Sequence, residues 1–205
     1  MSASDNKRLK SPSAARNRAP VLAVLREHLP TSGSGEHGIH AARSMPGWQW
    51  QPSDVNPDAL ASITAWREHM AQQHGACENL LAPVALDVNS AWPAGWQGAA
   101  FDAIVAINLI HISPWHVTQT LMQRASEYLS ATGVLFLYGP YRRHDQHTAS
   151  SNEAFDADLK ARDSSWGLRD LECVEAEAAA SGLVLERVVE MPANNLSVIF
   201  RRRAD

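Results

Sequence analysis

The segment at 183–203, close to the end of the given sequence, contains the feature that most restricts the fold. Two apolar segments, LVLERVVEM at 183–191 and NLSVIFRRR at 195–203, are joined only by the tripeptide Pro-Ala-Asn. A link this short permits only an antiparallel hairpin, because a parallel return needs a crossover of a dozen or more residues. Any fold assigned to the chain must therefore end with an antiparallel strand.

The middle of the chain reads as alternating strands and helices. The segments FDAIVAINLIHIS at 101–113 and VLFLYGP at 134–140 are continuous apolar runs, which are typical of strands buried on both faces of a parallel sheet. We expect a helix between them that opens at Pro114 and closes at Gly133, and a second helix over 169–182. The sequence thus predicts an α/β fold with a mostly parallel sheet and a C-terminal antiparallel strand.

The first half of the chain predicts similar units. WQWQPSD at 48–54 suggests a short strand that ends in a turn, and LLAPVALDV at 80–88 a second strand. Between them we expect a helix with Asn56 as N-cap, Pro57 in the first helical position and Gly75 as its stop.

The stretch TSGSGEHGIH contains a glycine pattern, G-x-G-x-x-G at 33–38, that is known from nucleotide-binding turns. Such a turn normally follows a hydrophobic strand and opens a helix. Here it follows APVLAVLREHLP, which reads as an amphipathic helix stopped by Pro30. Without its strand, the loop has a purely structural interpretation as an equal alternative.

Two aspartates strengthen the nucleotide interpretation. Asp54 and Asp87 fall at the ends of successive predicted strands, at the edge where open α/β sheets bind ligands. Singly, each is more often a turn or capping residue, but together they favour an adenosine-containing cofactor. NAD and S-adenosylmethionine share the adenosine. The antiparallel last strand favours the class I S-adenosylmethionine-dependent methyltransferase topology over a second, parallel dinucleotide-binding half.

Length and composition set the remaining bounds. With 205 residues, we expect a flexible N-terminal arm or lid over 1–18 and a single domain over 19–205. A net charge of −4 gives no general attraction to nucleic acid or to anionic membranes, so nucleic acid is an unfavoured partner. No apolar run reaches the roughly 18 residues of a membrane span. The N-terminal segment also lacks the apolar core of a secretory signal.

The cysteines and histidines predict no metal site. Cys77 and Cys173 lie on different predicted elements without C-x-x-C spacing, which fits a reducing cytoplasm. His144 and His147 have a spacing that could bind a metal, but no third ligand stands at a useful distance in the sequence.

Seven blocks spread over the chain carry a family resemblance. They are SPSAARNRAPVLAVLREHLP, SGSGEHGIHAA, WQWQPSDVNPDALASI, NLIHISPW, LFLYGPYRR, HTASSNEAFDADLKARDSSWGLRDLE and EMPANNLSVIFRR, in this order from about Ser11 to Arg203. Together they resemble the DUF938 family, the methyltransferase-like 26 group. The resemblance implies a Rossmann-like class I methyltransferase fold and binding of S-adenosylmethionine, with S-adenosylhomocysteine as product, but no particular substrate.

The resemblance also implies roles for individual residues. Gly33 and Gly35 would approach the methionine part of the cofactor, Asp54 would bind the ribose hydroxyls and Asp87 the adenine amino group. Asn108 would lie beside the cofactor. The full cofactor-binding set is Ser32, Gly33, Gly35, Glu36, Asp54, Asp87 and Asn108.

The chain departs from the family before the glycine loop. Family members carry about ten more residues there, including a strand of the VLEI type, whereas here only Thr31 separates Pro30 from Ser32. Since that strand is central in the sheet, its loss would leave buried backbone groups unpaired. Another segment fills the slot, or a partner chain such as that of a homodimer does, or the given sequence is shorter than the natural protein.

The acceptor side of the reaction is expected at the carboxyl ends of the strands predicted within 101–113 and 134–140, and in the loops that follow them. Methyl transfer needs alignment of the acceptor, and a base only where the acceptor must lose a proton. The candidate catalytic residues are His111, His116 and Tyr141. Each histidine has a structural alternative: His111 as a core residue and His116 as a solvent-facing one. The candidate substrate-binding residues are Arg16, Asn17, Trp115, Tyr138, Arg142, Arg143, Asn194 and Asn195.

Several of these substrate assignments have plainer alternatives. The polar stretch YGPYRRHDQHTASSNEAFD is longer than a routine connector, and its arginines could clamp a carboxylate or phosphate or belong to a solvated loop. Trp115 could stack on a flat acceptor or cover the core. The two asparagines could form the hairpin turn or face the pocket. Arg16 and Asn17 follow from the resemblance, as contacts of a lid.

Three functions remain in competition. The first is an S-adenosylmethionine-dependent methyltransferase that acts on a small molecule. The second is a binding or scaffold module on the same fold without catalysis. The third, an NAD-dependent oxidoreductase, rests on the glycine pattern alone and requires a parallel last strand.

Overall fold

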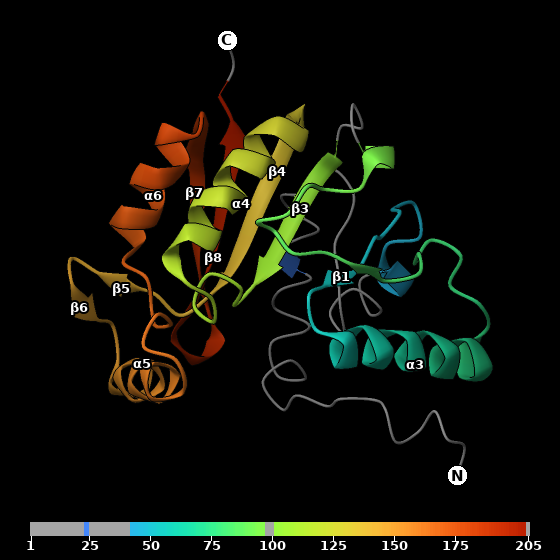
Figure 1. Ribbon diagram of the computed structural model, residues 1–205, viewed down its shortest axis with the longest axis horizontal. Coiled ribbons are helices and arrows are strands. Elements are labelled where there is room, and N and C mark those ends of the chain that lie inside the picture. The colour runs from blue at the N-terminus through green and yellow to red at the C-terminus, as the bar shows by residue number, and fades with distance from the viewer. Residues whose placement is uncertain (1–22, 25–41, 97–100, 204–205) are drawn as a thin grey trace. The chain divides into compact units, whose positions relative to one another are not determined.

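The computed structural model describes residues 23–24, 42–96 and 101–203 (Figure 1). The contacts divide the chain into two compact units, Met1–Trp92 and Pro93–Asp205, and each is described by itself below. The expected arm over 1–18 lies outside the described residues. The single domain over 19–205 stays a prediction.

The second unit is built on a four-stranded sheet. Its strand order is β3 (Phe101–Ile107), β4 (Leu129–Gly139), β8 (Asn195–Arg202) and β7 (Leu183–Met191). β3 and β4 are parallel, whereas β8 is antiparallel to both of its neighbours. The prediction of an antiparallel last strand is confirmed. The oxidoreductase hypothesis, which required a parallel last strand, is therefore abandoned.

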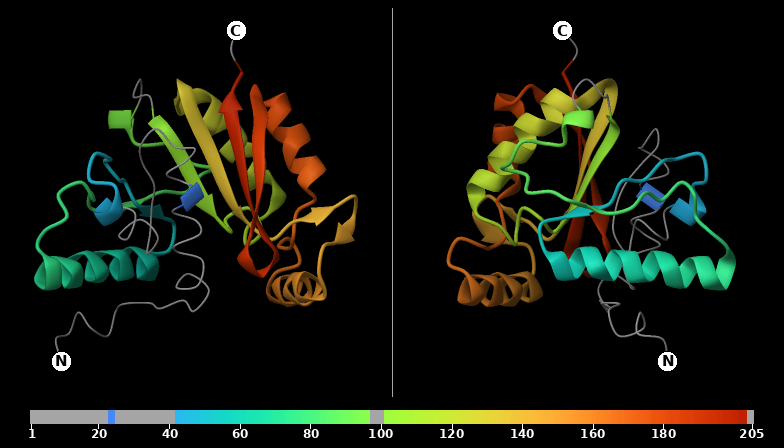
Figure 2. Two further views of the ribbon diagram at one scale, coloured as in Figure 1. Left: turned by 180° about the vertical axis from the view of Figure 1, so that it is seen from behind. Right: turned by 45° about the vertical axis from the view of Figure 1, so that its right-hand side comes forward.

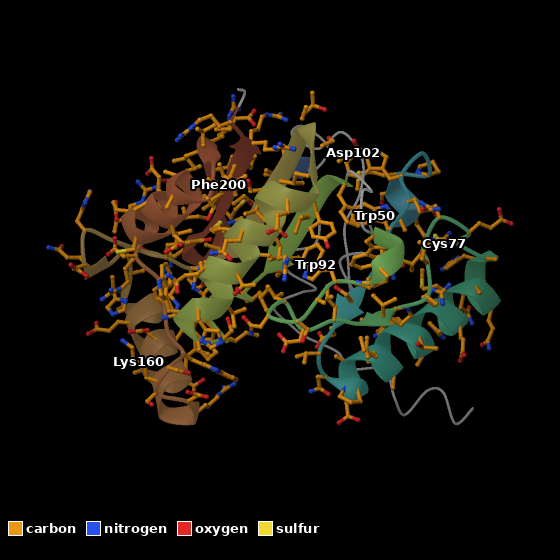
Figure 3. The ribbon with its side chains drawn as sticks, turned by 45° about the horizontal axis from the view of Figure 1, so that its top comes forward. Trp50, Cys77, Trp92, Asp102, Lys160 and Phe200 are labelled. Carbon is orange, nitrogen blue, oxygen red and sulfur yellow. The ribbon has the colours of Figure 1, made fainter. Side chains whose placement is uncertain are left out.

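The buried centre of this sheet is apolar. Leu135 pairs with Phe200 and Phe136 with Ile199, and all four side chains are fully buried. Phe200 lies within the sheet in Figure 3. Helices α4 (Trp115–Tyr128) and α6 (Leu171–Ala180) pack on one face (Figures 1 and 2). The continuous apolar runs of the sequence are thus explained by burial within the sheet and under two helices.

The end of α4 differs from the prediction. The helix was expected to close at Gly133, but it ends at Tyr128, and Leu129 already has the extended backbone that begins β4. Leu129 pairs with Phe101 and is almost fully buried, which draws the chain into the sheet. Gly133 lies within the strand. A Cβ there would lie only 2.7 Å from the carbonyl oxygen of Phe101, so close approach of the backbone explains this glycine.

The polar stretch after β4 is more regular than the sequence indicates. It forms a small hairpin, β5 (Arg142–Arg143) and β6 (Gln146–His147), followed by α5 (Ser150–Arg162). The two hairpin-turn residues His144 and Asp145 have φ values of 50° and 60°. Two successive left-handed residues are typical of the two-residue turns that join tight hairpins. The stretch is therefore not a long structureless loop.

The first unit contains the other parallel strands, which are short. β1 (Ser53–Asp54) pairs with β2 (Val84–Ala85), and an isolated parallel bridge joins Trp50 to Leu80. The two predicted strands are thus present but reduced to two residues each. α3 (Pro57–His74) has the predicted cap, because the side chain of Asn56 accepts a hydrogen bond from the Asp58 N–H.

A small core with a polar centre stabilises the first unit. Trp50 and Leu80 are buried with Ala42 and Met45, and the rings of Trp48 and Trp50 stack at 5.5 Å. The amide of Asn79 donates to the carbonyl oxygens of Ala42, Met45 and Trp48 at 2.7–3.3 Å. One side chain therefore satisfies the backbone of a turn that has no strand partner of its own.

The strand missing from the sequence is also missing from the described part of the chain. Among residues 42–96 and 101–203, β1 has β2 as its only strand partner and β3 has only β4. The glycine loop at 33–38 lies outside the described residues. None of the helices in the described ranges has the length and apolar content that a membrane span requires.

Candidate functional site

The first unit places two carboxylates at one end of its parallel strands. Asp54 is the last residue of β1, and Asp87 follows β2 by two residues. The Leu86 N–H donates to the Asp54 carbonyl at 3.0 Å, so both chains leave the pair at the same end. The expectation that the two aspartates stand at the ends of neighbouring strands is confirmed.

Both carboxylates also stabilise their own turns. Oδ1 of Asp54 accepts from the Asn56 N–H at 2.8 Å, and Oδ1 of Asp87 accepts from the Asn89 N–H at 2.9 Å. These are the local turns that aspartate commonly forms. Asp54 is half-buried and Asp87 is exposed. The Asn89 side-chain amide also donates to Asp87, at 3.2 Å. Since a carboxylate has about four lone-pair sites, these bonds leave room for a ligand hydroxyl or amine.

The second unit gathers its polar residues at the carboxyl ends of β3 and β4. Because β8 is antiparallel to both β4 and β7, the link between β7 and β8 returns to this end of the sheet (Figure 2). The Asn108 N–H donates to the Tyr138 carbonyl at 2.7 Å. The Asn195 amide donates to the Tyr138 hydroxyl at 3.0 Å. Three predicted site residues thus lie together here.

Asn108 has an unusual conformation. Its φ is 59°, a left-handed value that a non-glycine residue adopts only at a cost in free energy. Its Oδ1 is buried and has no hydrogen-bond partner. A Cβ at Gly139 would lie 2.8 Å from this oxygen and 2.6 Å from the ring of His111. Backbone strain and an unpartnered oxygen at one residue are typical of functional sites.

His111 is fully buried beneath this edge. Its ring meets that of Tyr141 edge-on with the centroids 4.9 Å apart, and neither ring nitrogen has a hydrogen-bond partner. The pKa of His111 is lowered to about 3, mainly by burial and also by the nearby charge of Arg169, while the charge of Asp156 and the backbone of Gly167 oppose the shift. The ring is therefore neutral at physiological pH.

The two tyrosines of the edge are neutral as well. Burial raises the pKa of Tyr138 to about 12, although the hydrogen bond from Asn195 opposes the shift. Burial also raises the pKa of Tyr141, whose hydroxyl is buried without a partner. Both hydroxyls keep their protons at physiological pH and can donate hydrogen bonds.

The first turn of α4 carries the other candidates of the loop. His116 is exposed, in agreement with its solvent-facing alternative, and Trp115 is half-buried. The guanidinium carbon of Arg169 lies 5.8 Å from the centroid of the Trp115 ring. This distance is within the range of a cation–π contact.

The arginines of the β5–β6 hairpin are placed differently from each other. Arg142 is half-buried and pairs with Asp145 at 3.2 Å, whereas Arg143 is exposed. Arg142 therefore already has a carboxylate partner, and Arg143 is the more accessible of the two for an anionic group.

The link between β7 and β8 is fixed to α5. It is the short turn η3 (Pro192–Asn194), in which Ala193 and Asn194 both have left-handed φ values near 60°. The Asn194 amide donates to the Ser151 hydroxyl at 3.2 Å, and its carbonyl accepts from Asn152 at 3.0 Å. α5 lies beside this turn in Figures 1 and 2. Asn194 thus contacts α5, while the neighbouring Asn195 contacts Tyr138.

Six predicted site residues lie outside the described residues: Arg16, Asn17, Ser32, Gly33, Gly35 and Glu36. The described residues contain no group of three or more histidine, cysteine or acidic side chains that could hold a metal ion.

Two residues with clear structural roles at this edge were absent from the sequence prediction. Arg169 donates three hydrogen bonds to backbone carbonyls, two of them in the loop that carries His111. Asp156 is a buried carboxylate on α5 that pairs with Lys160, which Figure 3 labels. Nothing in the sequence distinguishes Arg169, because its partners in the loop are backbone carbonyls 56 and 59 residues away. The pairing of Asp156 with Lys160 is an ordinary i,i+4 pair of a helix, and the sequence does not show that this carboxylate is buried.

The sheet order and the antiparallel last strand define a Rossmann-like methyltransferase fold. The chain belongs to the family described as "Protein of unknown function (DUF938)", whose profile matches residues 8–202. The resemblance stated from the sequence is thus confirmed.

Solved methyltransferases share the fold at low sequence identity. The mitomycin 7-O-methyltransferase MmcR has a TM-score of 0.73 at 16% identity, over 93% of this chain and 54% of its own. Human N-acetylserotonin methyltransferase, solved in complex with SAM, has 0.72 at 12% identity, over 94% and 53%. An O-methyltransferase family protein from Burkholderia thailandensis has 0.72 at 14% identity, over 91% and 56%. This chain therefore spans about half the length of these proteins.

Proposed function

We propose that the protein is an S-adenosylmethionine-dependent methyltransferase that acts on a small molecule. The observation that carries the proposal is the sheet, in which an antiparallel last strand lies between β4 and β7, as expected for class I methyltransferases. The similar solved structures add support, since their names include methyltransferases of mitomycin and N-acetylserotonin and one of them was solved with SAM.

The chemistry of the described side chains fits this cofactor. Asp54 offers a carboxylate for the ribose hydroxyls, and Asp87 offers one for the adenine amino group. Asn108 offers a buried amide oxygen that has no partner within the protein. Bound S-adenosylmethionine supplies a methyl group on a positively charged sulfur.

The chain's own residues would align the acceptor and exclude water, which are the main requirements of a direct displacement. Tyr138 and Asn195 form a hydrogen-bonded pair that can orient a polar acceptor. Trp115 offers an aromatic face, and Asn194, Arg142 and Arg143 offer polar groups at the same edge. The lid contacts Arg16 and Asn17, and the glycine-loop residues, belong to the proposal on the strength of the family resemblance.

Proton removal from the acceptor falls to His111, His116 or Tyr141 in this proposal. His111 is neutral and so has a free lone pair, but its low pKa makes it a weak base. His116 is exposed and sits on the first turn of α4. Tyr141 keeps its proton and would serve as a hydrogen-bond donor.

The test measures cofactor affinity by calorimetric titration with S-adenosylhomocysteine. Asp54→Asn keeps the turn bond to Asn56 and removes the charge, so it should weaken binding by about 1.5–3 kcal/mol. Asp58→Asn, on the first turn of α3, is the matched control and should bind as the wild type does. Absence of binding by the wild-type protein would refute the methyltransferase proposal, and unchanged affinity of Asp54→Asn would place the ribose elsewhere.

A second candidate is a binding or scaffold module on this fold without catalysis. It is favoured by one observation, the short β1–β2 pair with no further strand partner in the described residues. The same titration separates the two, because a stable wild-type protein without affinity for the cofactor would support the module. A cytoplasmic location and a homodimer are proposals that belong to either function.

A further inference from the structure

The loop between β3 and α4 is held almost entirely through its backbone carbonyls. The Asn108 carbonyl accepts from the N–H groups of His111 and Ile112, at 3.0 Å and 3.2 Å. The Leu109 carbonyl accepts from the Ser113 hydroxyl at 2.6 Å. Three further carbonyls of this loop accept hydrogen bonds from a segment far along the chain. They belong to Ile110, His111 and Ser113.

That segment is 165–169, and Arg169 makes most of the contacts. Its Nε donates to the Ile110 carbonyl at 2.8 Å, and one terminal nitrogen donates to the Ser113 carbonyl at 2.6 Å. The same nitrogen donates to the Ser165 carbonyl at 2.9 Å, which closes the segment on itself. The Gly167 N–H donates to the His111 carbonyl at 2.9 Å. The three loop carbonyls thus receive their donors from two residues of this segment, Gly167 and Arg169.

The segment is itself anchored on both sides. Oδ1 of the buried Asp156 accepts from the Leu168 N–H at 2.7 Å, and Oδ2 accepts from Lys160 at 2.5 Å. The Arg169 carbonyl accepts from the Arg142 N–H at 2.9 Å. The backbone of Arg169 is therefore held by hydrogen bonds that do not involve the 108–113 loop. This fixes the direction from which its planar guanidinium approaches the loop carbonyls.

We propose that Arg169 is a positioning residue that holds the 108–113 loop, and with it His111 and Trp115, in the geometry that receives the methyl acceptor. The inference deepens the proposed function and rests on it for the acceptor. The planar guanidinium is required, because it donates to two carbonyls that flank His111 at the same time. Its guanidinium carbon lies over the Trp115 ring, 5.8 Å from the centroid, so the same group contacts the side chain at the start of α4.

Charge is a second effect of Arg169, separable from its geometry. Two charged groups act on the His111 ring: Arg169 lowers its pKa and Asp156 raises it. The uncharged groups beside it are the Gly167 backbone, which also raises the pKa, and Tyr141, whose ring packs against it. Lysine at position 169 would keep the positive charge, but its single ammonium cannot reproduce the planar fork. Glutamine would remove both the positive charge and the planar group of donors.

The experiment compares Arg169→Gln, Arg169→Lys and the control Arg162→Gln, which removes an exposed arginine on α5. Histidine labelled with ¹³C reports the titration of His111 by NMR, with its signal assigned from a His111→Phe variant. Hydrogen exchange reports the opening of the loop. Titration of the wild type with S-adenosylhomocysteine is run beside these measurements.

In Arg169→Gln we expect amide exchange over 109–113 to accelerate about tenfold or more, as loss of two charge-assisted bonds implies. We also expect the pKa of His111 to rise. Arg169→Lys should show the faster exchange with a His111 pKa close to that of the wild type, and Arg162→Gln should show neither change.

Unchanged loop exchange in both Arg169 variants would overturn the inference, as would acceleration spread evenly over the whole chain. If Arg169→Gln does not fold, Arg169→Lys alone tests the inference: faster loop exchange with an unchanged His111 pKa would support it, and unchanged exchange would overturn it. Failure of the wild type to bind S-adenosylhomocysteine would instead refute the proposed function, since the loop measurements need no cofactor.

Discussion

The carboxyl ends of strands in the two units of the chain are built in contrasting ways. In the first unit, Asp54 ends one two-residue strand and Asp87 follows another, and neither side chain is buried. Within the protein, each carboxylate accepts a hydrogen bond from the backbone of its own turn. In the second unit, Asn108, His111 and Tyr141 carry buried polar atoms without partners, behind a sheet whose centre is fully buried. Accessible carboxylates contribute charge for a ligand at little cost to folding. Buried, tightly packed groups contribute shape, and folding depends on them.

This contrast predicts that substitutions at the buried site of the second unit mainly lower the stability of the fold. Substitutions of the two aspartates in the first unit should mainly weaken ligand binding. The largest effect should come from Gly139→Ala. The new methyl group would lie 2.6 Å from the His111 ring and 2.8 Å from Asn108 Oδ1, in a strand with no room to move. We expect the free energy of unfolding in urea to fall by about 3 kcal/mol.

Gly95→Ala is the matched control, because a Cβ there would meet nothing within 4 Å. Its stability should stay within about 0.5 kcal/mol of the wild type. Equal stability of the two glycine variants would mean that the His111–Asn108 packing is not tight.

The next effect is the pH dependence that the buried His111 imposes. Its pKa is about 3 in the folded protein and near 6.5 when exposed, so the unfolded chain binds a proton first as the pH falls. Stability should therefore be lost between pH 6.5 and 4.5, by about 2 kcal/mol, at up to about 1.4 kcal/mol per pH unit. Urea unfolding at several pH values measures the slope, and His111→Phe should flatten it. An equal slope in both proteins would contradict a buried, neutral His111.

A smaller loss is expected from Asn195→Ala, which removes the hydrogen bond to the Tyr138 hydroxyl. The free energy of unfolding should decrease by about 1 kcal/mol, since the partner is left buried at one end of the sheet. Asn89→Ala, which removes an exposed amide next to Asp87, provides the comparison and should cost less. If Asn195→Ala leaves the free energy of unfolding unchanged, the turn after β7 is held by its contacts with α5 alone.

The smallest effect on folding should come from Asp87→Asn in the first unit. The asparagine oxygen can still accept from the Asn89 N–H, so stability should change by less than about 0.5 kcal/mol. Affinity for S-adenosylhomocysteine should nevertheless fall by about fivefold or more, which is about 1 kcal/mol. Loss of stability without loss of affinity would reverse the proposed contrast between the units.

The sequence predicted the parts of the fold whose causes are local. Asn56, Pro57 and Gly75 begin and end α3 as expected, because caps act within a single turn. The hairpin through Pro192 was predictable because so short a link leaves one geometry. The end of α4 was not, because Gly133 is needed for its close approach to Phe101 rather than for stopping a helix.

The candidate site likewise contains residues that the sequence predicts and residues that it does not. Four candidates were predicted because they stand at strand ends, where position alone suggests a role: Asp54, Asp87, Asn108 and Asn195. Arg169 could not, because its partners are backbone carbonyls 56 and 59 residues earlier, which any residue provides. The burial of His111 was open to either interpretation until the packing of Tyr141 and Gly139 was known.

The place of β8 has a consequence for the order in which the protein takes shape during synthesis. β8 is the last strand along the described chain, yet it lies inside the sheet, between β4 and β7. While the ribosome is still making residues before 195, the edge of β4 that faces away from β3 has no strand partner. The β7–β8 hairpin can form within itself first, and its docking on β4 then completes the sheet in one late step. A nascent chain of this topology thus exposes an unpaired strand edge of β4, a site where other chains can pair, until residues 195–202 have been made.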